Sequence, residues 1–239
     1  MSLEGQRVVV IGGSSGIGLA AARQLVARSA RVTIVGRSAD KLAAAREAAG
    51  GTLFTREADL GDAEAARALF ENHGPFDHLV ITAGGSPAWG PFLELEPERL
   101  RAGMEAKFWV QFHAARYGAP RLHRTGSITF VGGGASRSAI PGTAGLAAVN
   151  GALAAMARTM ARELAPIRVN VVSPGFTDTP AYDGMPEEAR AELYHHMAEA
   201  ALVKRVGEAD EIAAAIVFLV TNGFTTGAVI DVDGGRRLG

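Results

Sequence analysis

The sequence predicts one α/β domain built around a doubly wound parallel sheet. Short runs of apolar, mostly β-branched residues alternate with longer alanine-rich segments of helical character. This alternation is typical of a parallel sheet whose strands are joined by right-handed helical crossovers. A glycine-rich turn joins the first apolar run to the first helical segment. The chain has 239 residues, enough to bury a full core, and we expect a single domain over 1–239.

The expected elements follow one another without a linker or internal repeat. Strands are expected at 8–11, 31–35, 52–57, 76–81, 126–131, 168–172 and 227–232. Helices are expected at 19–30, 38–49, 62–73, 98–122, 143–164, 187–200 and 209–220, the fourth with a bend near Pro120. Parallel strands end toward one edge of the sheet, so the loops at 12–18, 36–38, 59–60 and 82–85 should gather there. Such an edge is where doubly wound sheets bind ligands.

The glycine-rich turn predicts a phosphate site. Strand, glycine turn and helix in this order bring backbone N–H groups and a helix N-terminus to one point, which favours a bound phosphate or pyrophosphate. One glycine allows the tight turn, one lets the ligand approach the backbone, and one brings helix against strand. An ordinary βα turn is the alternative, because the glycine spacing differs from the commoner Gly-x-Gly-x-x-Gly. We expect nucleotide contacts from Gly12, Ser14, Ser15, Gly16, Ile17 and Gly18.

The end of the second strand indicates which nucleotide is bound. Position 36, where an NAD-binding unit would carry an acidic residue for the ribose 2′-hydroxyl, holds a glycine, and Arg37 and Ser38 follow. A carboxylate would repel a 2′-phosphate, whereas a guanidinium pairs with it. The sequence therefore predicts NADP(H) in preference to NAD(H). The alternative is that Arg37 simply lies in a solvated loop.

Composition excludes several classes of function. The formal net charge is −1 with no basic block, which argues against a nucleic-acid partner. The chain has no cysteine, hence no disulfide, thiol nucleophile or thiolate metal site. His195 and His196 lack a metal-ligand spacing, and we predict no metal site. The sequence has neither an apolar leader nor an 18-residue apolar run, and the expectation is a cytoplasmic protein without membrane association.

Several separated motifs, in the right order, resemble the short-chain dehydrogenase/reductase family from residue 7 to about 235. They are the glycines at 12, 16 and 18, Asp59, the run 77–80 with Ala83-Gly84, the run 168–175 ending in Pro174-Gly175, Thr226-Gly227, and 232–235. The resemblance implies a Rossmann-type domain of seven parallel strands that binds NAD(P)(H).

The resemblance also implies places for the cofactor and a state of assembly. Asp59, with Leu60, would lie at the adenine, Ala83 and Gly84 along the cofactor, and the residues after Pro174-Gly175 at the nicotinamide. Thr177 and Thr179 are then candidate cofactor contacts, with loop hydrogen bonding as the alternative. The family suggests a homo-oligomer, a tetramer or dimer, in which the helices at 98–122 and 143–164 form one interface and the 227–232 edge another.

The family's catalytic set does not carry over. Members use a Ser after the fifth strand, a Tyr thirteen residues later and a Lys four beyond. An alignment without gaps places Gly133, Leu146 and Asn150 in those slots. The helix-borne Asn of the family falls at Lys107, and the Asn of the turn after the fourth strand is Thr82. The usual proton-transfer groups are therefore absent from their usual places.

Four residues are candidates for the missing chemistry: Lys107, Ser136, Asn150 and Tyr182. A cation at Lys107 could restore the charge lost at Asn150, and a partly buried lysine can act as an acid near neutrality. Its alternatives are a surface-directed side chain or a structural ion pair. Ser136 lies three residues past the family slot, with turn formation as its alternative. Tyr182 is the one tyrosine expected near the pocket, whereas Tyr117 and Tyr194 are expected to pack.

Two functions follow from these residues. The first is an NADP(H)-dependent oxidoreductase that acts on a small carbonyl or alcohol with non-standard proton transfer, hydride transfer being the cofactor's chemistry. The second is a nucleotide-binding sensor or subunit without turnover. A largely apolar substrate pocket is expected from Trp89, Phe92, Ile140, Leu146, Phe176 and Tyr182.

Overall fold

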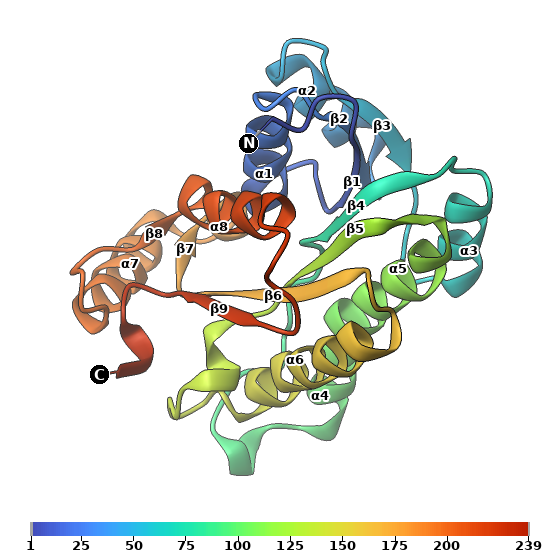
Figure 1. Cartoon of the computed structure of the whole chain (residues 1–239). Helices are drawn as coiled ribbons and strands as arrows, with labels where there is room; N and C mark the ends of the chain where they lie inside the picture. The colour runs from blue at the N-terminus through green and yellow to red at the C-terminus, as the bar shows by residue number, and fades with distance from the viewer. Residues whose placement is uncertain (1, 239) are drawn as a thin grey trace.

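A seven-stranded parallel sheet with helices on both faces forms the molecule (Figure 1). The structure, a computed structural model, describes residues 2–238. The strands run in the order β3-β2-β1-β4-β5-β6-β9, which confirms the doubly wound sheet. Their bounds are Arg7–Ile11 (β1), Arg31–Gly36 (β2), Phe54–Glu57 (β3), Phe76–Ile81 (β4), Leu122–Val131 (β5), Arg168–Pro174 (β6) and Val229–Val232 (β9).

Eight α-helices connect and flank these strands in the described chain. They are Gly16–Val26 (α1), Ala39–Ala48 (α2), Ala63–Glu71 (α3), Pro97–Gly103 (α4), Val110–Gly118 (α5), Ala144–Glu163 (α6), Glu187–Ala200 (α7) and Ala209–Thr221 (α8). A separate pair of two-residue parallel strands, Thr177–Asp178 (β7) and Gly207–Glu208 (β8), ties the segment after β6 to the start of α8. Strands this short leave no pattern in the sequence, and we did not predict them.

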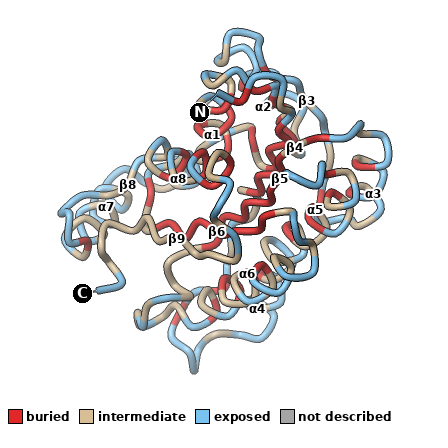
Figure 2. The backbone as a smooth tube through the Cα atoms, in the orientation of Figure 1, coloured by how far each residue is buried: buried red, intermediate tan, exposed pale blue. Residues whose placement is uncertain are grey.

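The hydrophobic core has one layer on each face of the sheet. Val8 and Val10 of β1 pack in the layer that contains residues of α1 and α8, whereas Val9 and Ile11 pack with residues of α3, α5 and α6. This alternation explains why β1 is apolar at every position, and Figure 2 shows the buried residues concentrated along the central strands. Full burial of each such side chain stabilises the fold by about 1.5–3 kcal/mol.

The register places the ligand edge at β1 and β4. Val10 pairs with Ile34 of β2 on one side and with Val80 of β4 on the other. The connection from β1 runs to β2, while the chain later returns to β1's other side as β4, so the strand order reverses here. Ligands of open α/β sheets bind outside the carboxyl ends of the strands at such a point.

The helix expected at 98–122 is wrong in its continuity and its end. The chain forms α4, then a π-helical turn at Met104–Trp109 (η2), then α5, which ends at Gly118. Pro120 lies in a short 3-10 turn after α5, so this proline follows the end of the helix and does not bend it. The fifth strand correspondingly starts at Leu122 and not at 126, with a register shift against β4.

The first helix also differs from the expectation at both ends. It begins at Gly16, inside the glycine turn, and ends at Val26 rather than at Ala30. Ser29 adopts a positive φ of 70°, which stops the helix before β2. The early start brings the helix N-terminus to the glycines, as a phosphate site requires.

A buried histidine lies on β4, toward the amino ends of the strands. His78 is 4% exposed, and its Nδ1 and Nε2 lie 2.8 Å from Ser127 Oγ and Gln6 Oε1. With Gln6 Oε1 as acceptor, Nε2 carries the hydrogen and Nδ1 accepts from Ser127. Burial, with the charge of Arg168, lowers the pKa of His78 to about 4. The imidazole is therefore neutral in the folded protein.

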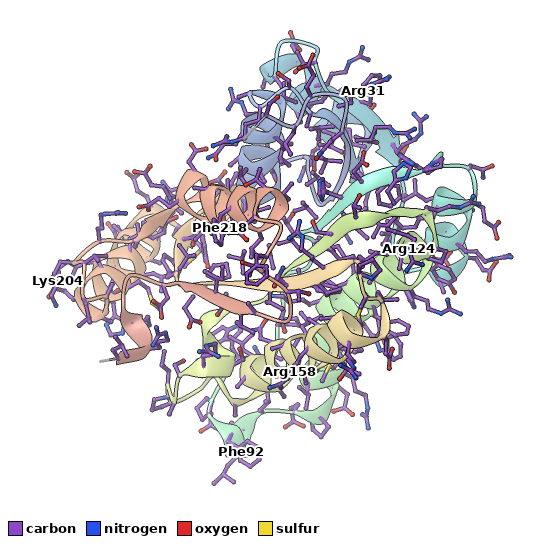
Figure 3. The ribbon with its side chains drawn as sticks, in the orientation of Figure 1. Arg31, Phe92, Arg124, Arg158, Lys204 and Phe218 are labelled. Atoms are coloured by element: carbon purple, nitrogen blue, oxygen red, sulfur yellow. The ribbon has the colours of Figure 1, made fainter. Side chains whose placement is uncertain are left out.

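Large apolar side chains are exposed at several places, including Phe92 of the loop after β4, and two of these places bear on assembly. Beside edge strand β9, Phe218 of α8 (labelled in Figure 3) is 45% exposed. Phe224, in the loop between α8 and β9, is fully exposed. On the opposite flank, Trp109 is 38% exposed where η2 meets α5. Contiguous exposed apolar surface is a mark of protein contacts.

Candidate active site at the carboxyl edge of the sheet

The glycine-rich turn is shaped by close backbone approaches. Gly12 has φ 80°, and a Cβ there would lie 2.8 Å from the nitrogen of Ala83. A Cβ on Gly18 would lie 2.2 Å from the carbonyl oxygen of Gly12, so only glycine lets α1 pack on the end of β1. A Cβ on Gly16 would lie 3.3 Å from Thr179, in the segment after β6. Gly12 thus allows the tight turn and Gly18 the close packing of helix on strand, as expected, whereas the approach of a ligand to Gly16 stays a prediction.

Thr82 holds the glycine-rich turn in place by hydrogen bonds, a role that we did not infer from the sequence. Its hydroxyl lies 2.9 Å from the carbonyl oxygen of Ile11 and 3.2 Å from that of Gly12. The backbone nitrogen of Thr82 also donates to the Ile11 carbonyl at 2.9 Å. The residue after β4 therefore fixes the position of the Gly12 peptide.

The loop after β2 carries a guanidinium that has no ion-pair partner among the described residues. A Cβ on Gly36 would lie 3.3 Å from Ser14 Oγ, so Ser14 of the glycine turn reaches the end of β2. Arg37 is exposed and forms no ion pair with any described residue. Ser38 is the N-cap of α2, and its Oγ accepts from the backbone nitrogen of Lys41 at 3.3 Å.

The loop after β3 is held by hydrogen bonds between side chains and its backbone. Asp59 is exposed, and its Oδ1 accepts from the nitrogen of Gly61 at 3.0 Å. Leu60 is buried, and its carbonyl oxygen lies 2.9 Å from Nδ1 of His113 on α5. These contacts fix the loop at the carboxyl edge of the sheet, with the Asp59 carboxylate facing solvent.

Lys107 points back to the end of β5 from the π-helical turn. Gly84 packs against this turn so closely that a Cβ on it would lie 2.6 Å from the carbonyl oxygen of Ala106. The Lys107 Nζ donates to the carbonyl oxygen of Gly132 at 2.7 Å. Burial lowers the pKa of Lys107 to about 8. Lys107 is half-buried, its ammonium is bound to a backbone carbonyl, and it forms no ion pair with the described residues, so the structural ion pair weighed from the sequence is not formed among them.

Gln111, four residues further along, binds the preceding peptide. Its Nε2 donates to the carbonyl oxygens of Val131 at 3.0 Å and Ala83 at 3.3 Å. Two side chains of one helical segment thus hold consecutive carbonyl groups at the end of β5. Gln111 is fully buried, and its Oε1 has no partner within residues 2–238.

Gly133, Leu146 and Asn150 lie together, as the alignment without gaps requires. A Cβ on Gly133 would lie 3.0 Å from Nδ2 of Asn150. That Nδ2 donates to the carbonyl oxygen of Leu146 at 2.9 Å, one helical turn back. Asn150 is 5% exposed, and its Oδ1 has no hydrogen-bond partner among the described residues. The carboxamide therefore faces the backbone of Gly133 with one acceptor unused.

Ser136 is bound within its own loop. Its Oγ donates to the carbonyl oxygen of Gly133 at 3.1 Å, and Ser138 Oγ donates to Gly134 in the same manner. Arg137, between them, pairs with Asp231 of β9 at 2.9 Å. This is the turn-forming arrangement that the sequence left as the alternative.

Tyr182 belongs to an aromatic cluster after β6. Its ring centroid lies 4.8 Å from that of Phe176 and 6.1 Å from that of Tyr194. The hydroxyl of Tyr194 donates to Asp178 Oδ1 at 2.5 Å. Tyr194 of α7 thus packs in this cluster, as expected, and the place of Tyr182 beside a substrate pocket stays a prediction. Burial raises the pKa of Tyr182.

Comparisons with known proteins agree with this geometry. Residues 11–237 match a family described as enoyl-(acyl carrier protein) reductase. The chain is 33% identical to the short-chain dehydrogenase/reductase ATR9 of Stachybotrys chlorohalonatus, over 99% of both chains. It is 34% identical to the 3-oxoacyl-[acyl-carrier-protein] reductase MabA of Mycobacterium avium, covering 97% of this chain and 90% of that one. A small-chain dehydrogenase solved in complex with NADPH matches at 37% identity and a TM-score of 0.85, covering 98% of this chain and 99% of that one.

This chain belongs to the short-chain dehydrogenase/reductase family. Membership makes it an oxidoreductase of that type with a site for a nicotinamide cofactor. The described residues fit such a cofactor. In this dehydrogenase/reductase, α1 begins inside the glycine turn, so its N-terminal N–H groups are available to a pyrophosphate, and the absence of a Cβ at Gly36 leaves room beside Ser14.

Thr177 and Thr179 differ in how free they are to contact a cofactor. Thr177 is buried, and its Oγ1 donates to the carbonyl oxygen of Gly175 at 3.1 Å. Thr179 is half-buried and lies beside Gly16. In this dehydrogenase/reductase, Thr177 makes the loop hydrogen bond weighed from the sequence, and a cofactor contact by Thr179 stays a prediction.

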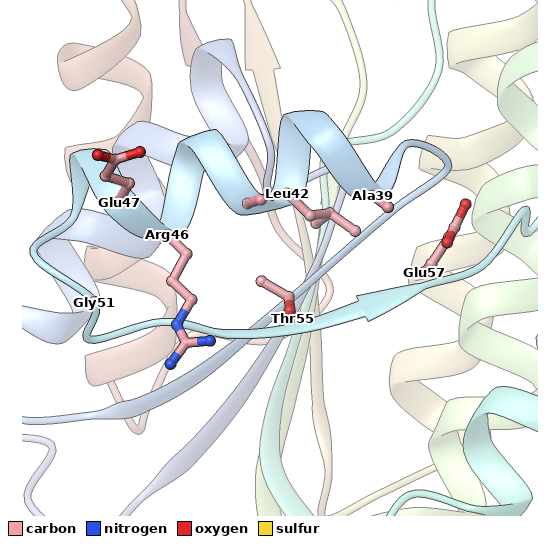
Figure 4. Close-up of a pocket in the computed structure, with 8 residues that line it drawn as sticks. Ala39, Leu42, Arg46, Glu47, Gly51, Thr55 and Glu57 are labelled. Carbon is pink, nitrogen blue, oxygen red and sulfur yellow. The ribbon is translucent and has the colours of Figure 1, made fainter.

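A hollow of about 410 Å³ lies between α2 and edge strand β3. Figure 4 shows Leu42 and Arg46 of α2 facing Thr55 of β3 across it. It lies along the strand and helix, away from the glycine turn, and Arg37 and Asp59 do not line it. We therefore assign it no part in cofactor binding.

Across residues 2–238 the structure contains no cluster of His, Cys, Asp or Glu that could hold a metal ion. Within the same residues, no helix is long and apolar enough to cross a membrane.

Proposed function

We propose that this short-chain dehydrogenase/reductase uses NADP(H) to interconvert a small, largely apolar carbonyl compound and its alcohol, with Lys107 supplying the proton. The observation that carries the proposal is the position of the Lys107 ammonium, 2.7 Å from the Gly132 carbonyl at the end of β5. The nicotinamide supplies or accepts the hydride when the cofactor is bound. The remaining chemistry belongs to the chain.

The preference for NADP(H) rests on the loop after β2. Arg37 carries an exposed guanidinium with no described partner, and glycine stands at 36 in place of an acid. Ser14 adds a hydroxyl beside Gly36. A guanidinium and a hydroxyl suit a 2′-phosphate. A structural relative solved with NADPH supports the same preference.

Lys107 fits the role of proton donor by position and acidity. One of its three ammonium hydrogens is used on Gly132, which orients the group and leaves two for a substrate oxygen. Because burial lowers the pKa of Lys107 to about 8, the amine is mainly protonated at pH 7 yet can release its proton. The neighbouring Gly133 and Leu146 carry no hydroxyl or phenol that could do so.

The other three candidates fit supporting roles. Asn150 has an unused Oδ1, but this atom is buried beside Gly133, so it can accept a hydrogen bond from a bound substrate or cofactor only after the Gly133 backbone shifts. Ser136 could donate to a substrate only by giving up its bond to Gly133. Tyr182, whose pKa is raised by burial, is a poorer acid than Lys107 near neutrality, and its packing with Phe176 suits an apolar wall.

Self-association is part of the proposal. The exposed Phe218 and Phe224 beside β9, and Trp109 on the flank of α5, are surfaces on which a second copy would bury apolar area. We propose a homo-oligomer, a dimer or tetramer, that uses these two surfaces.

The decisive experiment is turnover. The protein is incubated with NADPH and a panel of ketones, quinones and imines, and the loss of NADPH absorbance is followed, with a Lys107→Met variant in parallel. Turnover that depends on Lys107 supports the proposal. Silence across the panel, with NADPH bound in a parallel titration, would favour a nucleotide-binding protein without redox turnover.

A further inference from the structure

A small cavity lies beside Phe176 of the aromatic cluster, and no residue of the glycine-rich turn lines it. Its volume is about 160 Å³, and it lies between the end of α7, the start of α8, and the turn after β9. Figure 1 shows these elements gathered on the side of the molecule that carries the chain's C-terminal end. Phe176, Met197, Val203 and Ile212 are among its apolar walls. The cavity has room for more than a single water molecule.

Four charged residues also line this cavity, and three of them are already compensated. Arg205 binds Glu211 through two hydrogen bonds of 2.6 and 2.7 Å. The bond to Arg205 lowers the pKa of Glu211 to about 2, so this pair stays ionised. Asp233 accepts from the backbone nitrogens of Gly235 at 2.9 Å and Arg237 at 3.2 Å.

Arg236 is the fourth. Its Nη1 is buried and has no hydrogen-bond partner among the described residues, and the side chain forms no ion pair with any of them. A buried guanidinium N–H without an acceptor is costly, and such groups in folded proteins are normally satisfied by an ion, water or ligand. The cavity therefore has one uncompensated cation against apolar walls.

We propose that this cavity binds a small monocarboxylate with a short alkyl chain, its carboxylate on Arg236. The planar guanidinium pairs with a carboxylate through two parallel hydrogen bonds, and the apolar walls accommodate the chain. A phosphate dianion fits less well, because a single free cation cannot balance it while Glu211 and Asp233 line the same space.

The site would act on the segment that follows β6. Phe176 lines the cavity, and its ring also packs against Tyr182 at 4.8 Å and Tyr194 at 5.3 Å. A bound carboxylate would fix the cavity side of Phe176 and so stabilise the cluster that we expect beside the substrate. Binding itself is independent of the proposed reaction, so either can fail without the other.

The test uses butyrate as probe, with butyramide as its uncharged counterpart and inorganic phosphate as the second anion. Calorimetric titration and thermal unfolding are measured for the full chain at constant ionic strength. We expect saturable binding of butyrate with a rise in Tm, and no response to butyramide. Phosphate binding as tight as butyrate binding would overturn the assignment to a monocarboxylate.

Two arginines provide the variants. Arg236→Gln should weaken butyrate binding at least tenfold. Arg190→Gln, which removes a cation of α7 that neither lines the cavity nor pairs with a residue that does, should leave it within about twofold.

Ala201→Leu, which fills the cavity from its wall and keeps Arg236, should also abolish binding. Far-ultraviolet circular dichroism confirms that each variant folds. Equal butyrate binding by folded Arg236→Gln and Arg190→Gln proteins, or undiminished binding by folded Ala201→Leu, would overturn the proposal.

Discussion

Lys107 donates a 2.7 Å hydrogen bond from its Nζ to the carbonyl oxygen of Gly132, across the space between the π-helical turn and the end of β5. The bond explains why a lysine is tolerated in a desolvated position, since a carbonyl dipole compensates part of the lost hydration. By the alignment without gaps, Lys107 stands where the resemblance to the family leads us to expect an asparagine, and Asn150 where it leads us to expect a lysine. We propose that the charge expected at Asn150 of α6 is carried here by Lys107 on η2.

Replacing Lys107 tests its chemical role. If it donates the proton, Lys107→Met should lower kcat by ~10²–10⁴-fold and leave NADPH affinity nearly unchanged. In the wild type, the rate of carbonyl reduction should fall as the pH rises through about 8, because the amine then loses its proton. Steady-state kinetics over pH 6–10 and a direct NADPH titration measure both.

A structural cation would behave differently. Lys107→Met would then lower Tm or NADPH affinity, and the rate at saturating cofactor would be unchanged. A similar kcat for variant and wild type would remove Lys107 from the mechanism and leave Ser136 and Tyr182 to be tested.

The sequence predicted the sheet because its strands are read directly from apolar pattern. Runs such as 8–11 and 76–81 are buried on both faces, and only a parallel sheet covered by helices allows that. The glycines at 12 and 18 were interpretable for a similar reason, since their close contacts are with backbone atoms. Backbone geometry of this kind leaves a signature in the sequence.

The catalytic edge was less predictable, because side-chain direction there depends on packing between distant segments. The π-helical turn at 104–109 arises where Gly84 meets the helix, and no local periodicity announces it. Without that turn, neither the bond from Lys107 to Gly132 nor the burial of Gln111 could be deduced. The contact between Tyr194 and Tyr182 was likewise not predictable, because it depends on how α7 folds back on the segment after β6.

Arg37 should determine cofactor preference. We expect NADPH to bind more tightly than NADH, and Arg37→Ala to lower NADPH affinity roughly tenfold with little change for NADH, since a hydrogen bond to a charged group contributes about 1.5–3 kcal/mol and this one is exposed to solvent. Arg46→Ala, on the following helix α2, is the control. Calorimetry on both cofactors measures the six affinities of the three proteins, and equal affinities in the unmodified protein would contradict the preference.

His78 should make the fold sensitive to acid. Its pKa is lowered to about 4 in the folded protein, whereas an unfolded histidine titrates near 6.5. Between these values the unfolded state binds the additional proton. The contribution of His78 is therefore complete above pH 6.5 and is lost as the pH falls through 4, by roughly 3 kcal/mol.

Urea unfolding at pH 7.5, 6, 5 and 4 measures this loss. His78→Gln, which keeps a neutral hydrogen-bonding side chain, should be less stable at pH 7.5 but should show a shallower decline toward acid. Parallel stability curves for the two proteins would show that His78 does not titrate in this window.

Self-association should depend on the edge at β9. Phe218→Glu combined with Phe224→Ser introduces a charge and removes the exposed rings, and we expect this double variant to reduce the oligomer by at least one interface. Multi-angle light scattering at micromolar concentration gives the mass. A monomeric wild-type protein under these conditions would be incompatible with the proposed assembly.

Restoring the family's residues provides the most stringent test of the altered catalytic edge. Leu146→Tyr with Asn150→Lys should not yield an efficient reductase, because Lys107 would then face a second cation nearby and each disfavours the charged form of the other. Gly133 would still supply no hydroxyl to a substrate carbonyl.

Adding Lys107→Asn to the same pair removes the repulsion and completes the family's Asn, Tyr and Lys. The triple variant should therefore turn over faster than the double variant on any substrate found for the wild type. The comparison is made at saturating NADPH, with both variants shown to bind it. A double variant that matches or exceeds the triple would mean that Lys107 and the side chain at 150 do not interact, and that the exchange of charge between the two helices has no part in catalysis.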